Sequence, residues 1–176
     1  ALTGTPGWPP PLDPGTTPGR PPARKRRRRA PVHIPPGTQA EDPRAVEAMV
    51  RTADVVVVVD GYNLTMAAWP AAAPAEQRTR LVDALAELHL RARCRIVVVF
   101  DGADVEGVPP PRRRGLTVVF SPAHTEADDV VVAQVGALPM PVPVLVVSSD
   151  ASVRHQAEAR GATVVASGRF LPLLRR

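Results

Sequence analysis

The architecture of this chain is predicted most clearly from residues 55–63, which have the sequence VVVVVDGYN. Five consecutive β-branched residues favour a strand. Because none of the five is polar, both faces of this strand are expected to be buried. Such strands are typical of parallel sheets that are covered by helices on both sides. The strand is expected to end at the pair Asp60-Gly61.

The rest of the folded part alternates between short apolar runs and segments of helical periodicity. The further expected strands are residues 96–100, 116–120, 142–147 and 162–166. The expected helices are residues 76–93, 126–137 and 150–160. Residues 102–115 are expected to form a loop, and an apolar segment at 170–174 is expected to pack on the sheet. This alternation predicts an α/β fold, a three-layer sandwich with a parallel five-stranded sheet and right-handed crossovers.

The amino-terminal part differs in composition from the remainder. Residues 1–44 hold 12 of the 22 prolines and the basic run 24–29. A segment of this kind is expected to be disordered, because it cannot bury enough apolar surface to offset its ordering entropy. Its net charge is +5, whereas residues 45–176 are neutral and are expected to form one domain. Contact of this tail with nucleic acid and a purely solubilising arm are the two alternatives.

Several classes of protein are disfavoured by what the sequence lacks. Cys94 is the only cysteine, which excludes an internal disulfide and fits a reducing compartment. No apolar run approaches the roughly 20 residues of a membrane helix, and the amino terminus has no secretory signal pattern. A soluble cytoplasmic protein is therefore expected. Lys25 is the only lysine, which disfavours a P-loop, and the scattered histidines disfavour a zinc site.

Acidic residues stand at four junctions next to the expected strands. Asp60 and Asp101 follow the first two strands, Asp128 and Asp129 open the second helix, and Asp150 follows the fourth strand. Ligands of open parallel sheets bind at the carboxyl ends of the strands. Carboxylates gathered there repel one another unless a cation intervenes. The pattern therefore predicts a hard divalent metal ion and phosphate chemistry.

Each acid also has a purely structural explanation. Asp60 and Asp101 precede glycines, as in a turn after a strand. Thr125 and Asp128 have the spacing of a capping box, and Asp150 fits the N-cap of a helix. Asp129, which is adjacent to Asp128, is not needed for such a cap.

Other side chains near these acids suit a phosphodiester site. Asn63 is expected to orient a water or a carboxylate through its amide. Tyr62 and Trp69 lie in the expected loop after the first strand and suggest base stacking, although a hydrophobic lid on the core is the alternative for Trp69. The candidates for bidentate phosphate contacts are Arg112, Arg113 and Arg114, for which a solvated turn is the alternative.

Four short motifs occur in order along the folded part. They are VDGYN at 59–63, VFDG at 99–102, ADD at 127–129 and SSD at 148–150. Together they resemble the YacP-like NYN domain of the PIN-like nuclease superfamily, over residues 54–174. The resemblance implies a sheet in the order 3-2-1-4-5, a carboxylate cluster that binds Mg²⁺ or Mn²⁺, and cleavage of RNA. The Trp69-Pro70 pair and the segment from Ser167 are also similar to the family.

The resemblance further implies a role for individual residues. Asp60 corresponds to the first catalytic aspartate and Asn63 to the motif asparagine. The central acidic pair corresponds to Asp128 and Asp129, and the acid after strand four to Asp150. Asp101 corresponds to a junction acid and is expected to help bind the metal. Glu126 is an extra acid without an implied role.

These features lead to one main hypothesis and two rivals. The main hypothesis is a Mg²⁺- or Mn²⁺-dependent endoribonuclease, with RNA as its partner and the ribosome or another RNA–protein assembly as a further expected partner. The first rival is a non-catalytic RNA-binding module on the same fold. The second is a phosphatase or a nucleotide-cleaving enzyme on a related α/β sheet. The absence of an Asp-x-Asp motif and of a lysine in the domain disfavours the haloacid-dehalogenase type.

Overall fold

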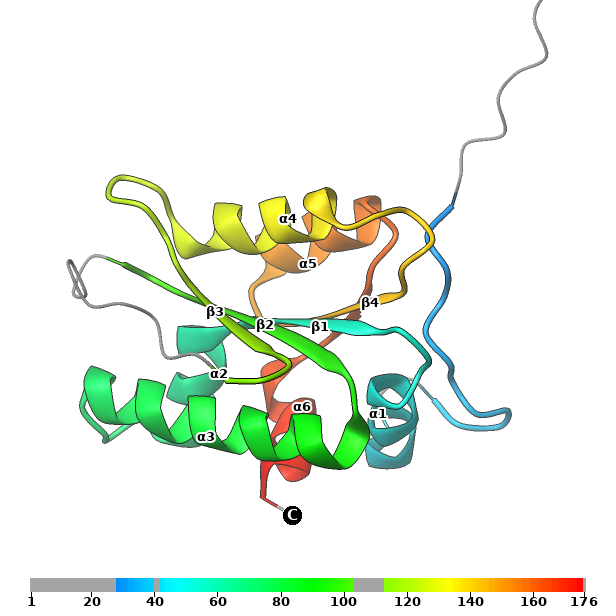
Figure 1. The fold of residues 1–176 in the computed structure, drawn as a ribbon, viewed down its shortest axis with the longest axis horizontal. Coiled ribbons are helices and arrows are strands. Elements are labelled where there is room, and N and C mark those ends of the chain that lie inside the picture. Colours follow the sequence, from blue (N-terminus) through cyan, green and yellow to red (C-terminus); the bar gives the residue numbers. More distant parts are fainter. Residues whose placement is uncertain (1–27, 40–41, 103–112, 176) are drawn as a thin grey trace, which may run out of the picture.

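The computed structural model describes residues 28–39, 42–102 and 113–175. Its centre is a parallel sheet with the strand order β3-β2-β1-β4-β5, as Figure 1 shows. The strands are β1 (Val56–Asp60), β2 (Arg95–Phe100), β3 (Leu116–Phe120), β4 (Val144–Val147) and β5 (Thr163–Val165). Both the five-stranded parallel sheet and its predicted order are confirmed.

Helices cover both faces of this sheet, so the predicted three-layer sandwich is confirmed (Figure 1). One face carries α4 (Ala127–Ala137) and α5 (Ala151–Ala159). The other face carries α1 (Pro43–Val50), α2 (Gly61–Ala68), α3 (Pro74–Ala92) and α6 (Ser167–Leu174). None of the helices in the described part of the chain combines the length and the apolar character needed to cross a membrane.

The valine run explains why the sheet has two cores. Alternate side chains of a strand point to opposite faces. Val57 and Val59 belong to the core under α1, α2, α3 and α6, whereas Val56 and Val58 belong to the core under α4 and α5. All four valines are at most 2% exposed. β1 is therefore the central strand, paired with β2 on one side and β4 on the other.

Three helices were not predicted, namely α1, α2 and α6. The segment after β1, predicted to be a loop, is helix α2, and it begins directly at Gly61. A Cβ atom on Gly61 would lie 2.5 Å from the Phe100 ring and 2.6 Å from the Val99 carbonyl oxygen. Because Gly61 has no side chain, α2 can start against the end of β2. Tyr62 therefore lies on this helix, and Trp69 is the residue at its end.

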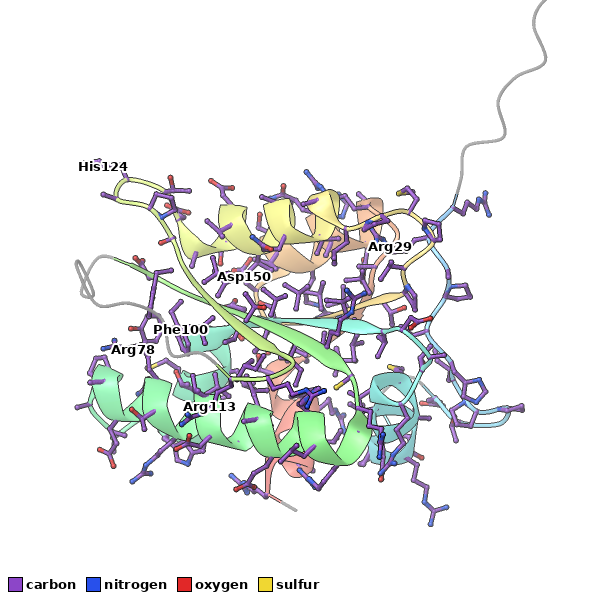
Figure 2. All side chains as sticks on the ribbon, viewed as in Figure 1. Arg29, Arg78, Phe100, Arg113, His124 and Asp150 are labelled. Atoms are coloured by element: carbon purple, nitrogen blue, oxygen red, sulfur yellow. The ribbon has the colours of Figure 1, made fainter. Side chains whose placement is uncertain are left out.

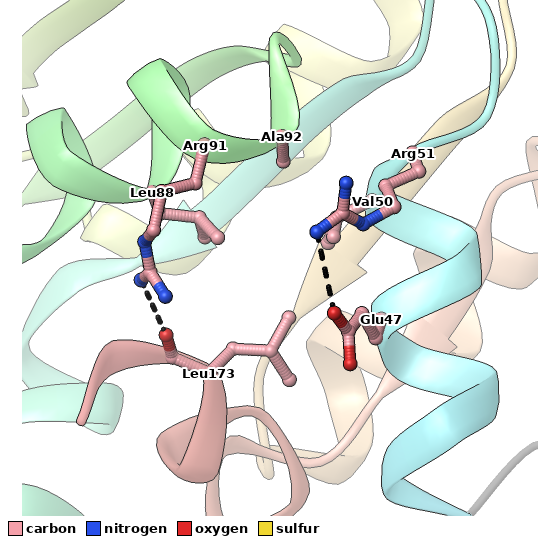
Figure 3. Close-up of a pocket in the computed structure, with 7 residues that line it drawn as sticks. All are labelled: Glu47, Val50, Arg51, Leu88, Arg91, Ala92 and Leu173. Atoms are coloured by element: carbon pink, nitrogen blue, oxygen red, sulfur yellow. Dashed lines mark hydrogen bonds and ion pairs between the residues drawn. The ribbon is translucent and has the colours of Figure 1, made fainter. Parts of the chain in front are cut away.

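The second unpredicted helix, α1, lies at the boundary of the predicted tail. Asp42 caps it by accepting a hydrogen bond from the Arg44 backbone N–H at 2.8 Å. Figure 3 shows where α1 meets α3 and α6, around a small cavity of about 20 Å³. There the Arg91 guanidinium donates to the Leu173 carbonyl at 2.8 Å, which ties α3 to α6.

Residues 28–39 belong to the segment that was predicted to be a tail up to residue 44, and they pack on the domain. Val32 is buried in the core beside α1, and the His33 backbone N–H donates to Thr52 Oγ1 at 2.8 Å. Arg29, which belongs to the basic run 24–29 of the predicted tail, is only 7% exposed. Residues 1–27, the larger part of the predicted tail, lie outside the described residues.

Within the described residues, all hydrogen-bond partners of the Arg29 side chain are backbone carbonyls. Its guanidinium donates to the carbonyl oxygens of Val135, Leu138, Pro139, Val142 and Arg160, at 2.9 to 3.5 Å. These carbonyls lie at the carboxyl ends of α4 and α5 and in the turn that follows α4. The negative end of a helix dipole favours a cation, so one arginine caps two helix ends. Figure 2 shows Arg29 far from Arg78 and Phe100.

Candidate active site at the carboxyl ends of the strands

An acidic cleft of about 550 Å³ opens where β1, β2 and β4 end. Its lining comes from the ends of two strands and the first turns of three helices. The lining residues are Asp60, Tyr62, Asn63, Met66, Asp101, Glu126, Ala127, Asp128 and Asp150. The structure therefore brings together Asp60, Asp101, Asp128 and Asp150, four of the five predicted metal ligands, along with Asn63 and Tyr62.

Asp60 is the most buried of these acids, with 5% of its surface exposed. It is the last residue of β1 and also the N-cap of α2. One carboxylate oxygen, Oδ1, accepts from the Asn63 backbone N–H at 3.2 Å. The other, Oδ2, accepts from the Ser148 hydroxyl at 2.8 Å. Ser148 directly follows β4, the neighbouring strand, so strand order determines this contact.

Burial raises the pKa of Asp60 from 3.8 to about 6. The hydrogen bonds from Ser148 and Asn63 oppose this rise, and the nearby charges of Asp128 and Asp150 add to it. Burial disfavours the charged form of a carboxyl group, and like charges do the same. Burial and the two neighbouring acids thus make ionisation of Asp60 costly, and a bound cation would lower that cost.

Asn63 is fixed by a network that the sequence analysis did not identify. Its Oδ1 accepts from the Ser149 backbone N–H at 2.9 Å and from the Ser167 hydroxyl at 2.6 Å. The Ser167 backbone N–H in turn donates to Ser149 Oγ at 3.0 Å. A backbone N–H is always a donor, so the amide oxygen must face Ser149. The only signals in the sequence were the Ser-Ser-Asp motif and the family-like segment from Ser167.

Asp150 is both a helix cap and a residue of the cleft. Its Oδ1 accepts from the Val153 backbone N–H at 2.9 Å, which caps α5. The structural explanation for Asp150 is therefore confirmed. The cap uses one carboxylate oxygen, and the residue still lines the cleft. Its backbone N–H donates to Ser148 Oγ, the same hydroxyl that donates to Asp60.

Asp128 does not take part in a helix cap, so the predicted capping box is wrong. The N-cap of α4 is Glu126, and no side chain caps that helix. Asp128 is half-buried in the first turn. Burial, followed by the charges of Asp150, Glu126 and Asp129, raises the pKa of Asp128. Asp128 caps no helix, and it lines the cleft together with Asp60, Asp101, Glu126 and Asp150.

Asp129 is the predicted metal ligand that does not line the cleft. It is exposed on α4, because adjacent residues of a helix point about 100° apart. Glu126, the extra acid in the sequence, lines the cleft in its place. Asp101 lies at the rim, exposed, where it accepts a long hydrogen bond of 3.4 Å from the Ser121 hydroxyl.

Two of the three arginines predicted to bind RNA, Arg113 and Arg114, do not line this cleft. Arg112 lies outside the described residues. Arg113 and Arg114 precede β3 and so lie at the amino-terminal edge of the parallel sheet. That edge is about 17 Å from the carboxyl ends, the length of a five-residue strand. Arg113 forms an exposed ion pair with Asp83 at 3.4 Å, as expected of a solvated turn.

The acids suit a metal of a particular type. Their donors are carboxylate oxygens, and hard cations such as Mg²⁺ and Mn²⁺ prefer oxygen ligands. Within the described residues, however, no three His, Cys, Asp or Glu side chains lie close enough to hold an ion by themselves. Mg²⁺ commonly uses one or two carboxylates and keeps several waters. The donor set therefore fits a hydrated cation rather than a closed protein cage.

The raised pKa of Asp60 predicts how stability depends on pH without divalent ions. Between about pH 4 and pH 6 the folded protein binds this proton more tightly than the unfolded chain. The contribution of this proton to the free energy of unfolding is therefore complete below pH 4 and is lost as the pH rises through 6. A rise from 3.8 to about 6 corresponds to about 3 kcal/mol at most.

Urea unfolding in EDTA at pH 4 to 7 checks this prediction. Relative to the Asp60→Asn variant, the wild-type protein is expected to lose unfolding free energy as the pH rises over that range. Parallel curves for the two proteins would contradict the assigned environment of Asp60.

Comparisons with known proteins concern the family and the fold of this chain. Residues 57–176 match the family model of the YacP-like NYN domain. Among curated proteins, no match was found. The fold is similar to the crystal structure of Rae1 (YacP) from Bacillus subtilis, with a TM-score of 0.60 and 25% identity, over 68% of this chain and 73% of that chain. The crystal structure of a point mutant of that protein gives a TM-score of 0.56 and 23% identity, over 68% of this chain and 74% of that chain.

Proposed function

Because this chain belongs to the YacP-like NYN domain family, we propose that it is a metal-dependent endoribonuclease that cleaves RNA phosphodiesters at the acidic cleft. The observation that carries this proposal is the environment of Asp60. Asp60 is 5% exposed, and the charges of two further acids, Asp128 and Asp150, act on its carboxyl group. Such a group is costly to ionise alone, and a cation bound beside it stabilises the charged form.

Asp60, Asp128 and Asp150 are the residues proposed to hold Mg²⁺ or Mn²⁺, with Asp101 at the rim. When bound, such an ion lowers the pKa of a coordinated water and polarises the phosphate. The side chains supply the rest. Ser148 orients the Asp60 carboxylate through a 2.8 Å hydrogen bond. Asn63, fixed by Ser149 and Ser167, presents its amide to the cleft.

An RNA-binding module without cleavage is the second candidate. One observation favours it, namely that no three metal-ligating side chains of the described residues converge on a common point. The two candidates share the cleft and differ in whether RNA is cut there.

Incubation of the protein with end-labelled RNA in Mg²⁺, Mn²⁺ or EDTA separates these functions. The nuclease proposal predicts internal cleavage products with either ion and none in EDTA. RNA that is retained but stays intact under all three conditions would support the binding module. Products that form equally in EDTA would overturn the metal-dependent reaction.

A further inference from the structure

A second hollow lies beside the acidic cleft, and the proposed function does not use it. It measures about 460 Å³ and is lined by Tyr62, Met66, Pro70, Ala72, Pro74, Gln77 and Asp101. Tyr62, Met66 and Asp101 also line the acidic cleft, so the two spaces share a wall. The size is within the roughly 300–1,000 Å³ range of small-molecule sites.

The lining of this hollow is mostly apolar and partly aromatic. Met66 is 56% exposed, an unusual position for a large apolar side chain on a short helix. Tyr62 is half-buried and packs edge-on against Phe100, with ring centroids 5.3 Å apart. Methionine and aromatic side chains make favourable contacts with flat ligands. The shared wall can therefore contact a nucleobase.

Buried polar contacts hold this wall in place. Gln77, 3% exposed, donates to the carbonyls of Trp69 and Ala72, both at 3.0 Å. Its Oε1 accepts from the Thr65 hydroxyl at 2.8 Å. The same amide NH₂ lies 3.8 Å from the Met66 sulfur. The end of α2, the following turn and the start of α3 are thus connected, and a site of fixed shape binds with less loss of entropy.

Arg78 places a positive charge beside Tyr62, one of the residues that line this hollow. Its guanidinium donates to the Tyr62 hydroxyl at 2.6 Å. Among the described residues, no carboxylate pairs with it, whereas Arg80 pairs with Glu76 on the same helix. Only one of its five donors is used in that contact, and a guanidinium matches the geometry of phosphate oxygens. Arg78 is therefore available to bind an anion such as a phosphate.

From this arrangement we infer that the hollow is a nucleotide subsite. The base of one nucleotide packs against Tyr62 and Met66, and an adjacent phosphate binds Arg78. The inference rests on the proposed function, since it takes RNA as the ligand. It adds how the RNA strand is positioned next to the acids. One base contacts the shared wall, and a phosphate next to that base enters the cleft. The base must be unstacked from its neighbours to enter.

Equilibrium binding of a fluorescent RNA oligonucleotide in EDTA tests this inference. Arg78→Ala is expected to weaken binding roughly tenfold and to reduce the salt dependence by about one phosphate contact. Arg80→Ala, on the same helix, is the matched control and is expected to change affinity less than about twofold. Thermal unfolding shows whether the variants stay folded. Equal effects of the two substitutions would overturn the phosphate contact.

The base contact is tested by coupling between the RNA and the protein. An oligonucleotide that lacks the base at one position is expected to bind the wild-type protein roughly tenfold more weakly. Met66→Ser is expected to weaken binding of the intact RNA, but to add little for the abasic RNA. If no abasic position shows this coupling, the subsite is wrong. These binding assays do not depend on cleavage. If the coupling is found but the protein cuts no RNA in Mg²⁺ or Mn²⁺, the nuclease proposal is rejected and the subsite is retained.

Discussion

An Asp60→Asn variant is expected to lose RNA cleavage by on the order of a thousandfold, the effect of losing one essential group of a catalytic site. The substitution removes the negative charge and keeps the size of the side chain. It would leave the proposed cation without its most buried ligand, while the hydrogen bond from the Asn63 backbone N–H can persist. Initial rates of cleavage in Mg²⁺ measure the loss, and retention of RNA is expected to stay largely intact.

Asp129→Asn is the matched control for this variant. It makes the same change of charge on the exposed side of α4, outside the cleft. Cleavage is expected to stay within about twofold of the wild-type rate, because exposed charges that make no specific contact have small effects. If the two variants cut equally fast, Asp60 is not part of the active centre.

An Arg29→Met variant is expected to unfold about 3 kcal/mol more easily than the wild-type protein. Arg29 donates five hydrogen bonds to carbonyls at the ends of two helices. Hydrogen bonds to a charged group contribute more than neutral ones, and buried acceptors left without donors are costly. For a domain of this size, the loss corresponds to a decrease of about 10 °C in Tm. Urea or thermal unfolding measures it.

Arg28→Met tests whether this effect belongs to Arg29 itself. Arg28 is the exposed neighbour in the same basic run, and its substitution is expected to change the unfolding free energy by less than about 0.5 kcal/mol. Equal losses for the two variants would show that the basic run acts through its overall charge. An Arg29→Met variant as stable as the wild-type protein would contradict the claim that Arg29 stabilises the fold.

The sheet was predictable because its strands carry the information locally. The run of valines has no polar residue to face solvent, and each face then fills one of the two cores. Helix α2 lacked such a signal. It has only eight residues, including Gly61 and Asn63, which have low helix propensity. Its stability comes from the cap at Asp60 and from packing, which no periodicity reveals.

The site was predictable to the level of strand ends and no further. Topology brings Asp60 and Asp150 together, since β1 and β4 are neighbours. The choice between Asp128 and Asp129 depends on the rotation of α4 about its axis, which tertiary packing sets. Arg29 could not be distinguished from the rest of its basic run, because its partners lie 106 or more residues downstream.

The central claim is that a divalent cation binds among the carboxylates of Asp60, Asp128 and Asp150. Anomalous diffraction from crystals soaked in Mn²⁺ locates such an ion directly. The claim predicts a peak in the cleft at coordination distance from Asp60 and from at least one of the other two, and no such peak in the Asp60→Asn variant. A Mn²⁺ peak elsewhere with an empty cleft, or an unchanged peak in the variant, would contradict it.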